Sequence, residues 1–149
     1  MTNDVIKLTV DKFIFQFHKD LRYSDSGLWI RQDESLARIG ISDFAQQRNG
    51  DIAFANLPAA GTVLDVGDEV ASIETVKVNI SLPSPVKGKI VETNSALEES
   101  PELINQDPYG KGWMVVLQVE ALEPEMCKLL DAEAYSKIVR QQAEAGLKA

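Results

Sequence analysis

The chain has 149 residues, of which 44% are hydrophobic and 26% are charged, and its formal net charge at pH 7 is −8. These values are typical of a globular protein about the size of one domain. The negative charge argues against nucleic-acid binding, because phosphate contacts require clustered lysine and arginine. With Cys127 as the single cysteine and His18 as the single histidine, an internal disulfide and a metal site rich in cysteine or histidine are excluded.

Membrane-spanning and secretory segments are not expected. No apolar run approaches the roughly 20 residues that a membrane-spanning helix requires. The N-terminal segment, MTNDVIKLTVDKFIF, lacks the basic start and the long apolar stretch of a signal peptide. We therefore expect a cytoplasmic protein with no membrane partner.

The first two thirds of the chain read as a series of short β-strands. In KFIFQF, Phe13, Phe15 and Phe17 fall at every second position, which is typical of a strand with one buried face. This strand is expected to end near His18. Further strands are expected in GLWIR, SLARIGI, DIAFANL, EVASIETV, VNISL, GKIVET and GWMVVLQVE. Glycine, proline, asparagine and aspartate separate these segments, which favours a sandwich or a barrel.

Helices are expected to be short until the end of the chain. Ser42 is placed to cap a helix over DFAQQR, and Ser95 with Glu98 has the spacing of a capping box. From Pro124 onward, apolar residues recur at four-residue spacing, which predicts one face of a helix that Asp131 divides in two. The residues on this face are Met126, Leu130, Ala134 and Ile138.

These patterns predict a single domain over residues 1–149. Its β-rich core covers about residues 12–120, and a C-terminal helical extension covers about residues 124–146. Cys127 lies near the apolar stripe of the extension, so we expect a small buried side chain there and not a reactive thiol. The sequence offers no nucleophile paired with a base, and we therefore expect no enzymatic activity.

Lys77 lies between two predicted strands, in the segment ETVKV. If Thr75–Val78 turns the chain, Lys77 stands at the tip of a hairpin. Threonine, valine and lysine suit the left-handed residues of two-residue hairpin turns poorly, and a type I turn accommodates them better. An exposed tip that departs from local turn preference is typical of a site that another protein reads. From the residues alone, an ordinary solvated lysine is the alternative.

Ordered motifs between about Leu28 and Leu117 resemble a known family. They are GISDFAQ, GDIAFANLP, GDEVASIETVKV and SPVKGKIVETNSALEESPELINQDPYGKGW. With them, the chain resembles the H proteins of the glycine cleavage system, which are lipoyl carriers. The resemblance implies a mainly β fold, a lipoyl/biotinyl-type barrel-sandwich hybrid with short helices and a C-terminal helical extension. The family's modified lysine lies in an E-[ST]-V-K-A-like motif, and Lys77 falls on it.

The resemblance implies that lipoic acid is attached to Lys77 through an amide, in a carrier that is not itself an enzyme. Such a carrier would shuttle an aminomethyl group and electrons between the P, T and L proteins, after modification by a lipoate–protein ligase or other lipoyl-assembly enzymes. In the family, the arm can fold into a groove, which here would involve the N-terminal strands and the helical extension. Glu74 would orient a ligase or partner, or would be an ordinary solvated residue. We expect a monomer.

Several positions differ from the family pattern. An early strand of H proteins carries H-E-W, and here YSDSGLW keeps only Trp29. Val78 follows the lysine where alanine is usual, and Lys111 stands where an acidic residue is frequent. These differences leave open an H-like lipoate-binding protein that carries sulfur intermediates to a heterodisulfide-reductase-like complex in sulfur oxidation. An unmodified interaction module is a further alternative, whereas a biotin carrier would place its lysine in M-K-M.

Overall fold

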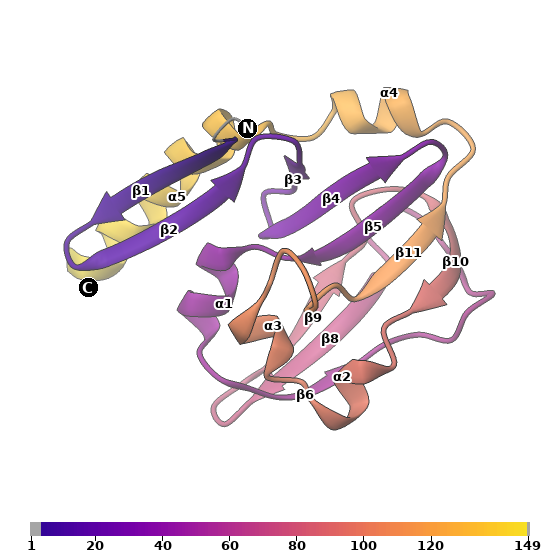
Figure 1. Ribbon diagram of the computed structural model, residues 1–149, viewed down its shortest axis with the longest axis horizontal. Helices are drawn as coiled ribbons and strands as arrows, with labels where there is room; N and C mark the ends of the chain where they lie inside the picture. Colours follow the sequence, from indigo (N-terminus) through magenta and orange to yellow (C-terminus); the bar gives the residue numbers. More distant parts are fainter. Residues whose placement is uncertain (1–3, 149) are drawn as a thin grey trace.

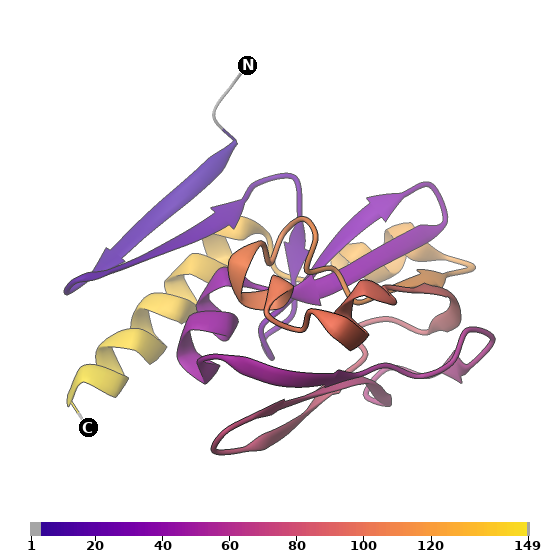
Figure 2. The ribbon, with the colours of Figure 1, turned by 60° about the horizontal axis from the view of Figure 1, so that its bottom comes forward.

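The structure is a computed structural model that describes residues 4–148, and it is mainly β with helices concentrated at the C-terminal end (Figures 1 and 2). The strands are β1 (Val5–Val10), β2 (Phe13–His18), β3 (Arg22–Tyr23), β4 (Leu28–Asp33), β5 (Leu36–Ile41), β6 (Ile52–Asn56), β7 (Val63–Leu64), β8 (Glu69–Thr75), β9 (Asn79–Pro83), β10 (Gly88–Thr93) and β11 (Val115–Gln118). The helices are α1 (Asp43–Asn49), α2 (Ala96–Glu99), α3 (Leu103–Gln106), α4 (Leu122–Cys127) and α5 (Ala132–Lys148).

Within the described residues, the strands form three sheets in which neighbours are antiparallel. A six-stranded sheet in the order β3-β4-β5-β11-β10-β7 makes one layer, and the three-stranded sheet β6-β8-β9 makes the other. The remaining pair, β1 and β2, stands out at one end of the molecule beside α5 (Figures 1 and 2). The expected mainly β fold with a C-terminal helical extension is confirmed.

The main hydrophobic core contains inward-facing residues of both layers. Ile39 of β5, Ile73 of β8 and Ile90 of β10 are fully buried in it. Full burial of such a side chain stabilises the fold by about 1.5–3 kcal/mol relative to exposure. Because Val70, Ala71 and Ile73 are buried in this core, it fixes the position of β8 as far as Ile73.

A second, aromatic cluster attaches α5 and the β1–β2 hairpin to the sheet. Phe17 meets the Tyr135 ring edge-on at 5.5 Å, and Tyr23 stacks on Tyr135 at 4.8 Å between ring centroids. Phe15 and Phe17 are buried, whereas Phe13 is 41% exposed. The predicted alternation in β2 is therefore confirmed, with its outermost phenylalanine at the surface.

In the C-terminal helices one expectation is confirmed and two are corrected. Asp131 divides the helical segment as expected, and its carboxylate accepts a hydrogen bond from the Ala134 N–H at 2.8 Å. The break changes the helical phase, so the buried face of α5 is not the predicted stripe but consists of Ala132, Tyr135 and Val139. Cys127 is exposed, because α4 turns Leu122 and Met126 inward instead; the expectation of a buried thiol is wrong.

Helix caps give one confirmation and one correction. Ser42 caps α1 by accepting a hydrogen bond from the Ala45 N–H, as predicted. The predicted capping box is wrong, since the Ser95 side chain makes no cap hydrogen bond. Asn94 takes that role, accepting a hydrogen bond from the Ala96 N–H at 3.2 Å. None of the helices in the described part of the chain is long and apolar enough to cross a membrane.

Candidate functional site

Lys77 lies at the tip of the hairpin formed by β8 and β9. Glu74 is opposite Asn79 in the strand register, so Thr75 and Val78 flank a loop of two residues. The Thr75 N–H donates a hydrogen bond of 2.9 Å to the Val78 carbonyl, which closes the loop. This hairpin tip projects from the body of the molecule (Figures 1 and 2).

The Thr75 side chain fixes the backbone of the tip. Its hydroxyl oxygen accepts hydrogen bonds from the Lys77 N–H and the Val78 N–H, each at 3.2 Å. Among the described non-glycine residues, only Asp11 and Glu34 have positive φ, so the loop contains no left-handed residue. This explains why valine and lysine are tolerated there. The role of Thr75 escaped the sequence analysis, although threonine is a known turn-forming residue.

The tip is exposed while the base of the hairpin is buried. Val76 is 95% exposed, and Lys77 and Val78 also lie at the surface. The Lys77 ammonium makes no hydrogen bond or ion pair with any residue in the range 4–148. Four residues before Lys77, Ile73 is fully buried. The arrangement presents a free primary amine on a rigid base.

Near Lys77, a row of side chains crosses the outer face of the three-stranded sheet, from β6 through β8 to β9. Glu74 pairs with Asn79 on one side and with Phe54 of β6 on the other. Phe54 is 61% exposed, and Glu74 is half-buried. Glu74 has no ion pair among the described residues, so its carboxylate is open to a partner.

A cavity of about 280 Å³ lies beside the hairpin. Ile80 and Leu82 of β9 form one wall, and residues of α1, of α5 and of the loop before β4 form the others. The helical extension lines this cavity as expected of the groove, but β1 and β2 do not. Ile80 is three residues beyond Lys77, which is about 10 Å of extended strand. A lysine stem extended by an acyl chain is longer than that. The cavity lies within reach of a group attached to Lys77.

The cavity wall is held together by contacts between distant parts of the chain. Ser42 at the start of α1 and Tyr135 of α5 share a hydrogen bond of 2.8 Å between their hydroxyls. This phenol is neutral at physiological pH, and burial raises the pKa of Tyr135 further, to about 12. Gly27 has φ 95°, and a Cβ there would lie 3.0 Å from the Cβ of Ala45. The close approach of the loop to α1 requires this glycine.

Gly27 and Leu28 occupy the two positions before Trp29. Leu28 is fully buried in the main core, and Trp29 is buried with its indole N–H donating to the Pro108 carbonyl at 2.8 Å. These are the positions at which the resemblance noted above leads one to expect H-E-W. This chain therefore presents neither an imidazole nor a carboxylate at these two positions.

The remaining candidates lie away from Lys77. His18 ends β2, as predicted, and its ring packs on Tyr109 at 4.5 Å between centroids. Cys127 lies on α4, outside the cavity. Among residues 4–148, no group of three or more histidine, cysteine, aspartate or glutamate side chains is placed to hold a metal ion.

Comparisons with known proteins agree on one family. The family described as glycine cleavage H-protein matches residues 21–142 of this chain. The glycine cleavage system H protein of Carboxydothermus hydrogenoformans is 44% identical over 126 residues, which cover 85% of this chain and 96% of that protein. The probable glycine cleavage system H protein of Aeropyrum pernix is 40% identical over 145 residues, which cover 97% of this chain and 100% of that one.

A solved structure gives the same result for the fold. The crystal structure of a glycine cleavage system H protein from Mycobacterium marinum superposes with a TM-score of 0.74 at 31% identity, covering 81% of this chain and 97% of that one. The expected lipoyl-type barrel-sandwich fold is thereby confirmed. Proteins of this family are non-catalytic lipoyl carriers. The chain belongs to the glycine cleavage H-protein family.

Proposed function

We propose that this protein carries lipoic acid in amide linkage on the Lys77 side-chain nitrogen and shuttles an aminomethyl group and electrons between the enzymes of glycine cleavage. The observation that carries the proposal is the exposed, unpaired amine at the tip of the β8–β9 hairpin, inside the segment that matches the family. Lipoic acid attachment and contacts with the P, T and L proteins and a lipoyl ligase are what family membership implies.

The residues present fit the proposed group. Acylation removes the positive charge of the lysine, and this breaks no ion pair among the described residues, because Lys77 has none. When bound, lipoic acid supplies a strained cyclic disulfide that is reduced to two thiols. The protein contributes position: Thr75 orders the tip, and the buried base of the hairpin keeps it extended.

Access for partners follows from the same geometry. Val76 and Val78 flank the lysine and are exposed, so a ligase meets two apolar side chains beside the reactive amine. Glu74 and Phe54 extend this surface along the outer face of the sheet. Exposed valine and phenylalanine side chains favour contact with another protein surface.

The cavity beside the hairpin is suited to shelter the end of the arm. Its walls combine the apolar side chains of Ile80 and Leu82 with the neutral phenol of Tyr135. Arg48 is placed at the same cavity. We propose that the arm alternates between this cavity, where water is partly excluded, and the open tip, where client enzymes reach it.

An exchange assay tests the carrier function. Lipoylated protein is mixed with glycine decarboxylase, glycine and labelled bicarbonate, and incorporation of label into the glycine carboxyl group is measured. We expect exchange with the wild type and with Lys87→Arg, and none with Lys77→Arg. Lys87 is a matched control, because it is exposed and lies outside the hairpin.

The same assay separates the two carrier roles that the sequence left open. A decarboxylase that is active with another H protein but gives no exchange with this lipoylated chain would contradict the glycine cleavage role. That result would favour the carrier of sulfur intermediates. The absence of lipoylation by every competent ligase would instead favour the unmodified interaction module.

A further inference from the structure

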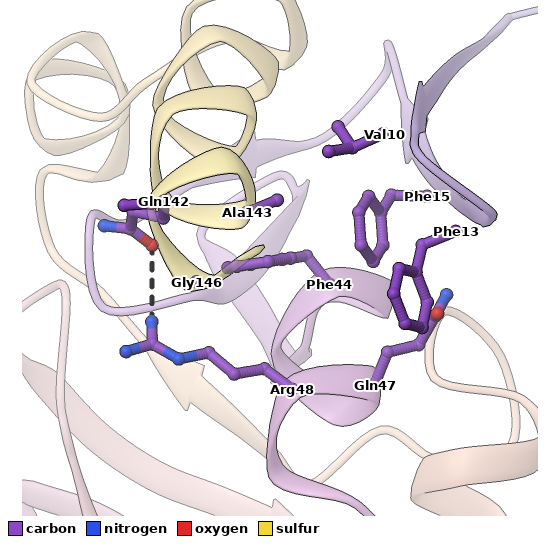
Figure 3. A pocket seen from close by; sticks show the side chains of 10 residues that line it. Val10, Phe13, Phe15, Phe44, Gln47, Arg48, Gln142, Ala143 and Gly146 are labelled. Atoms are coloured by element: carbon purple, nitrogen blue, oxygen red, sulfur yellow. Dashed lines mark hydrogen bonds between the residues drawn. The ribbon is translucent and has the colours of Figure 1, made fainter. Parts of the chain in front are cut away.

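A second cavity, a groove of about 660 Å³, lies at the outer end of the molecule between the β1–β2 hairpin, α1 and α5. Its walls are apolar: Phe13 and Phe15 of β2 face Phe44 of α1, and Ala143 of α5 lies across from them (Figure 3). The groove is within the range of about 300–1,000 Å³ that is typical of small-molecule sites. We refer to it as the outer groove.

The outer groove is built largely from parts of the chain that lie outside the family match. That match covers residues 21–142, so β1, β2 and the last turns of α5 are not part of it. The Aeropyrum relative aligns over 145 residues, 97% of this chain, whereas the Carboxydothermus relative aligns over 126. The groove therefore combines residues outside the family match with four residues inside it, which are Phe44, Gln47, Arg48 and Gln142.

Among residues 4–146, one charged side chain lines the groove, and it is the cation Arg48. Arg48 lines one end of the groove, and its guanidinium donates a hydrogen bond of 3.4 Å to the Gln142 side-chain oxygen, whereas the Gln47 side chain points the other way, toward Phe13 (Figure 3). Within residues 4–148, Arg48 makes no ion pair with a carboxylate. In a chain with a net charge of −8, an arginine without an acidic partner beside an apolar groove is complementary to an anion.

The acidic residues near Arg48 in α1 and near Gln142 in α5 interact with other side chains. Asp43 of α1 accepts hydrogen bonds from the Gln16 N–H and from the side-chain amides of Gln46 and Gln47. Glu144 of α5 is 4.0 Å from Arg140. Neither acid lines the groove, and Asp25, which lines the neighbouring cavity together with Arg48, makes no ion pair with it among the described residues. A ligand therefore competes for Arg48 with the neutral Gln142 side chain and not with a carboxylate.

We propose that the outer groove binds a free medium-chain carboxylate. The apolar chain lies between Phe13, Phe15 and Phe44, and the carboxylate accepts hydrogen bonds from the Arg48 guanidinium at the end of the groove. One cation at one end of an apolar space fits a molecule with one charged end. Arginine binds a carboxylate through paired, charge-assisted hydrogen bonds, which gives the ligand a fixed direction.

The outer groove shares lining residues with the cavity beside Lys77, but binding in the groove does not require an arm in that cavity. Phe44, Arg48 and Gln142 line both cavities. A bound carboxylate would draw Arg48 from Gln142 and alter the wall between them. The binding itself requires no lipoyl group, so it is tested with unlipoylated protein, and its failure is distinguishable from failure of the carrier function.

Octanoate is the probe, used below its micellar concentration with the full-length, isotope-labelled chain. Titration followed by amide NMR should give saturable shifts confined to β1, β2, α1 and α5. Arg48→Gln should weaken octanoate binding about tenfold, as expected for loss of a hydrogen bond to a charged group. Arg140→Gln, an exposed arginine on α5 that does not line the groove, should leave binding unchanged. Octylamine should not bind.

A second variant blocks the groove without removing a core residue. Ala145 lines the groove from the exposed side of α5, so Ala145→Trp should abolish octanoate binding and leave the melting temperature unchanged. Equal binding by wild type, Arg48→Gln and octylamine would overturn the proposal, as would shifts outside the groove or no saturable binding. Binding of a peptide with an apolar C-terminal residue, where octanoate fails, would overturn it in favour of a protein partner.

Discussion

The β8–β9 hairpin and the β1–β2 hairpin differ in which part of each is buried. In β8–β9, burial is confined to the base: Val70 and Ile73 are fully buried, and Val76 at the tip is almost fully exposed. In β1–β2, buried side chains continue to the residue before the turn, and they are Leu8, Val10, Phe15 and Phe17. The β8–β9 hairpin therefore exposes Lys77 at its tip, whereas the β1–β2 hairpin packs along its length against α5 and the aromatic cluster.

The edges of the two hairpins are satisfied differently as well. β8 pairs with β6, so the hairpin that carries Lys77 continues a sheet. β2 has no strand on its outer edge, and side chains take the place of one. The Gln47 amide donates to the Ile14 carbonyl at 3.0 Å, and the Tyr109 hydroxyl donates to the Gln16 carbonyl at 2.6 Å. A hairpin outside the family match is thus fixed to the shared core by side-chain hydrogen bonds and aromatic packing.

The largest effect is expected in the β1–β2 hairpin. Phe17→Ala should lower the free energy of unfolding by about 3–5 kcal/mol, because it removes a fully buried ring and leaves a cavity against Tyr135. Phe13→Ala, at the exposed end of the same face, should cost much less. Urea unfolding measures both, and equal losses for the two variants would show that the hairpin does not pack as described.

At the base of the β8–β9 hairpin, Ile73→Ala should lower the free energy of unfolding by about 2–5 kcal/mol. At the tip, Val76→Ala should change it by no more than about 0.5 kcal/mol, because that side chain is already in solvent. Thermal or urea unfolding of the pair tests the division between base and tip. A large loss from Val76→Ala would contradict a free tip.

Alkaline pH should weaken the region around α5. Burial raises the pKa of Tyr23 and of Tyr109 well above the usual value near 10, and that of Tyr135 to about 12. The unfolded chain therefore loses these protons first as the pH rises. Stability is fully present below pH 10 and falls above it, by at most about 1.4 kcal/mol per pH unit for each tyrosine until its folded-state pKa is reached, which for Tyr135 is about 12.

Absorbance at 295 nm provides the measurement, because these are the three tyrosines of the chain. The folded protein should show little phenolate signal near pH 10–11, and ionisation should coincide with unfolding. Titration of all three tyrosines near pH 10 in a protein that remains folded would contradict their burial.

A modest loss of stability is expected when the side chain that orders the turn is removed. Thr75→Ala removes the acceptor of the hydrogen bonds from the Lys77 and Val78 N–H groups and should cost about 0.5–1.5 kcal/mol. Hydrogen exchange at these two amides should become faster, whereas Thr75→Ser, which keeps the hydroxyl, should stay close to wild type. Unchanged exchange in Thr75→Ala would show that the threonine does not order the tip.

Much of the shared core could be predicted from the sequence, because its signals are local. Short segments bounded by glycine, proline, asparagine and aspartate identified the strands around Lys77, and Ser42 was recognised as a cap from its position before DFAQQR. The strand β1 could have been found as β2 was, since Ile6, Leu8 and Val10 alternate with polar residues. Strands β3 and β7 have only two residues each and carry no period of their own.

The parts that were missed depend on distant contacts. The two cavities share a wall in which Arg48 meets Gln142, 94 residues away, and no local pattern predicts that meeting. The exposure of Cys127 depends on where α4 begins, and the face that α5 buries depends on where Asp131 restarts the helix. Periodicity identified the C-terminal helical segment but not the face that α5 buries.

The most direct test is the intact mass of the protein after expression with a lipoate–protein ligase, followed by peptide mapping. The wild type and Lys87→Arg should each gain one lipoyl group, located on the peptide that contains Lys77, and Lys77→Arg should gain none. A chain that stays unmodified, or a Lys77→Arg variant that gains the same mass, would contradict attachment at the hairpin tip.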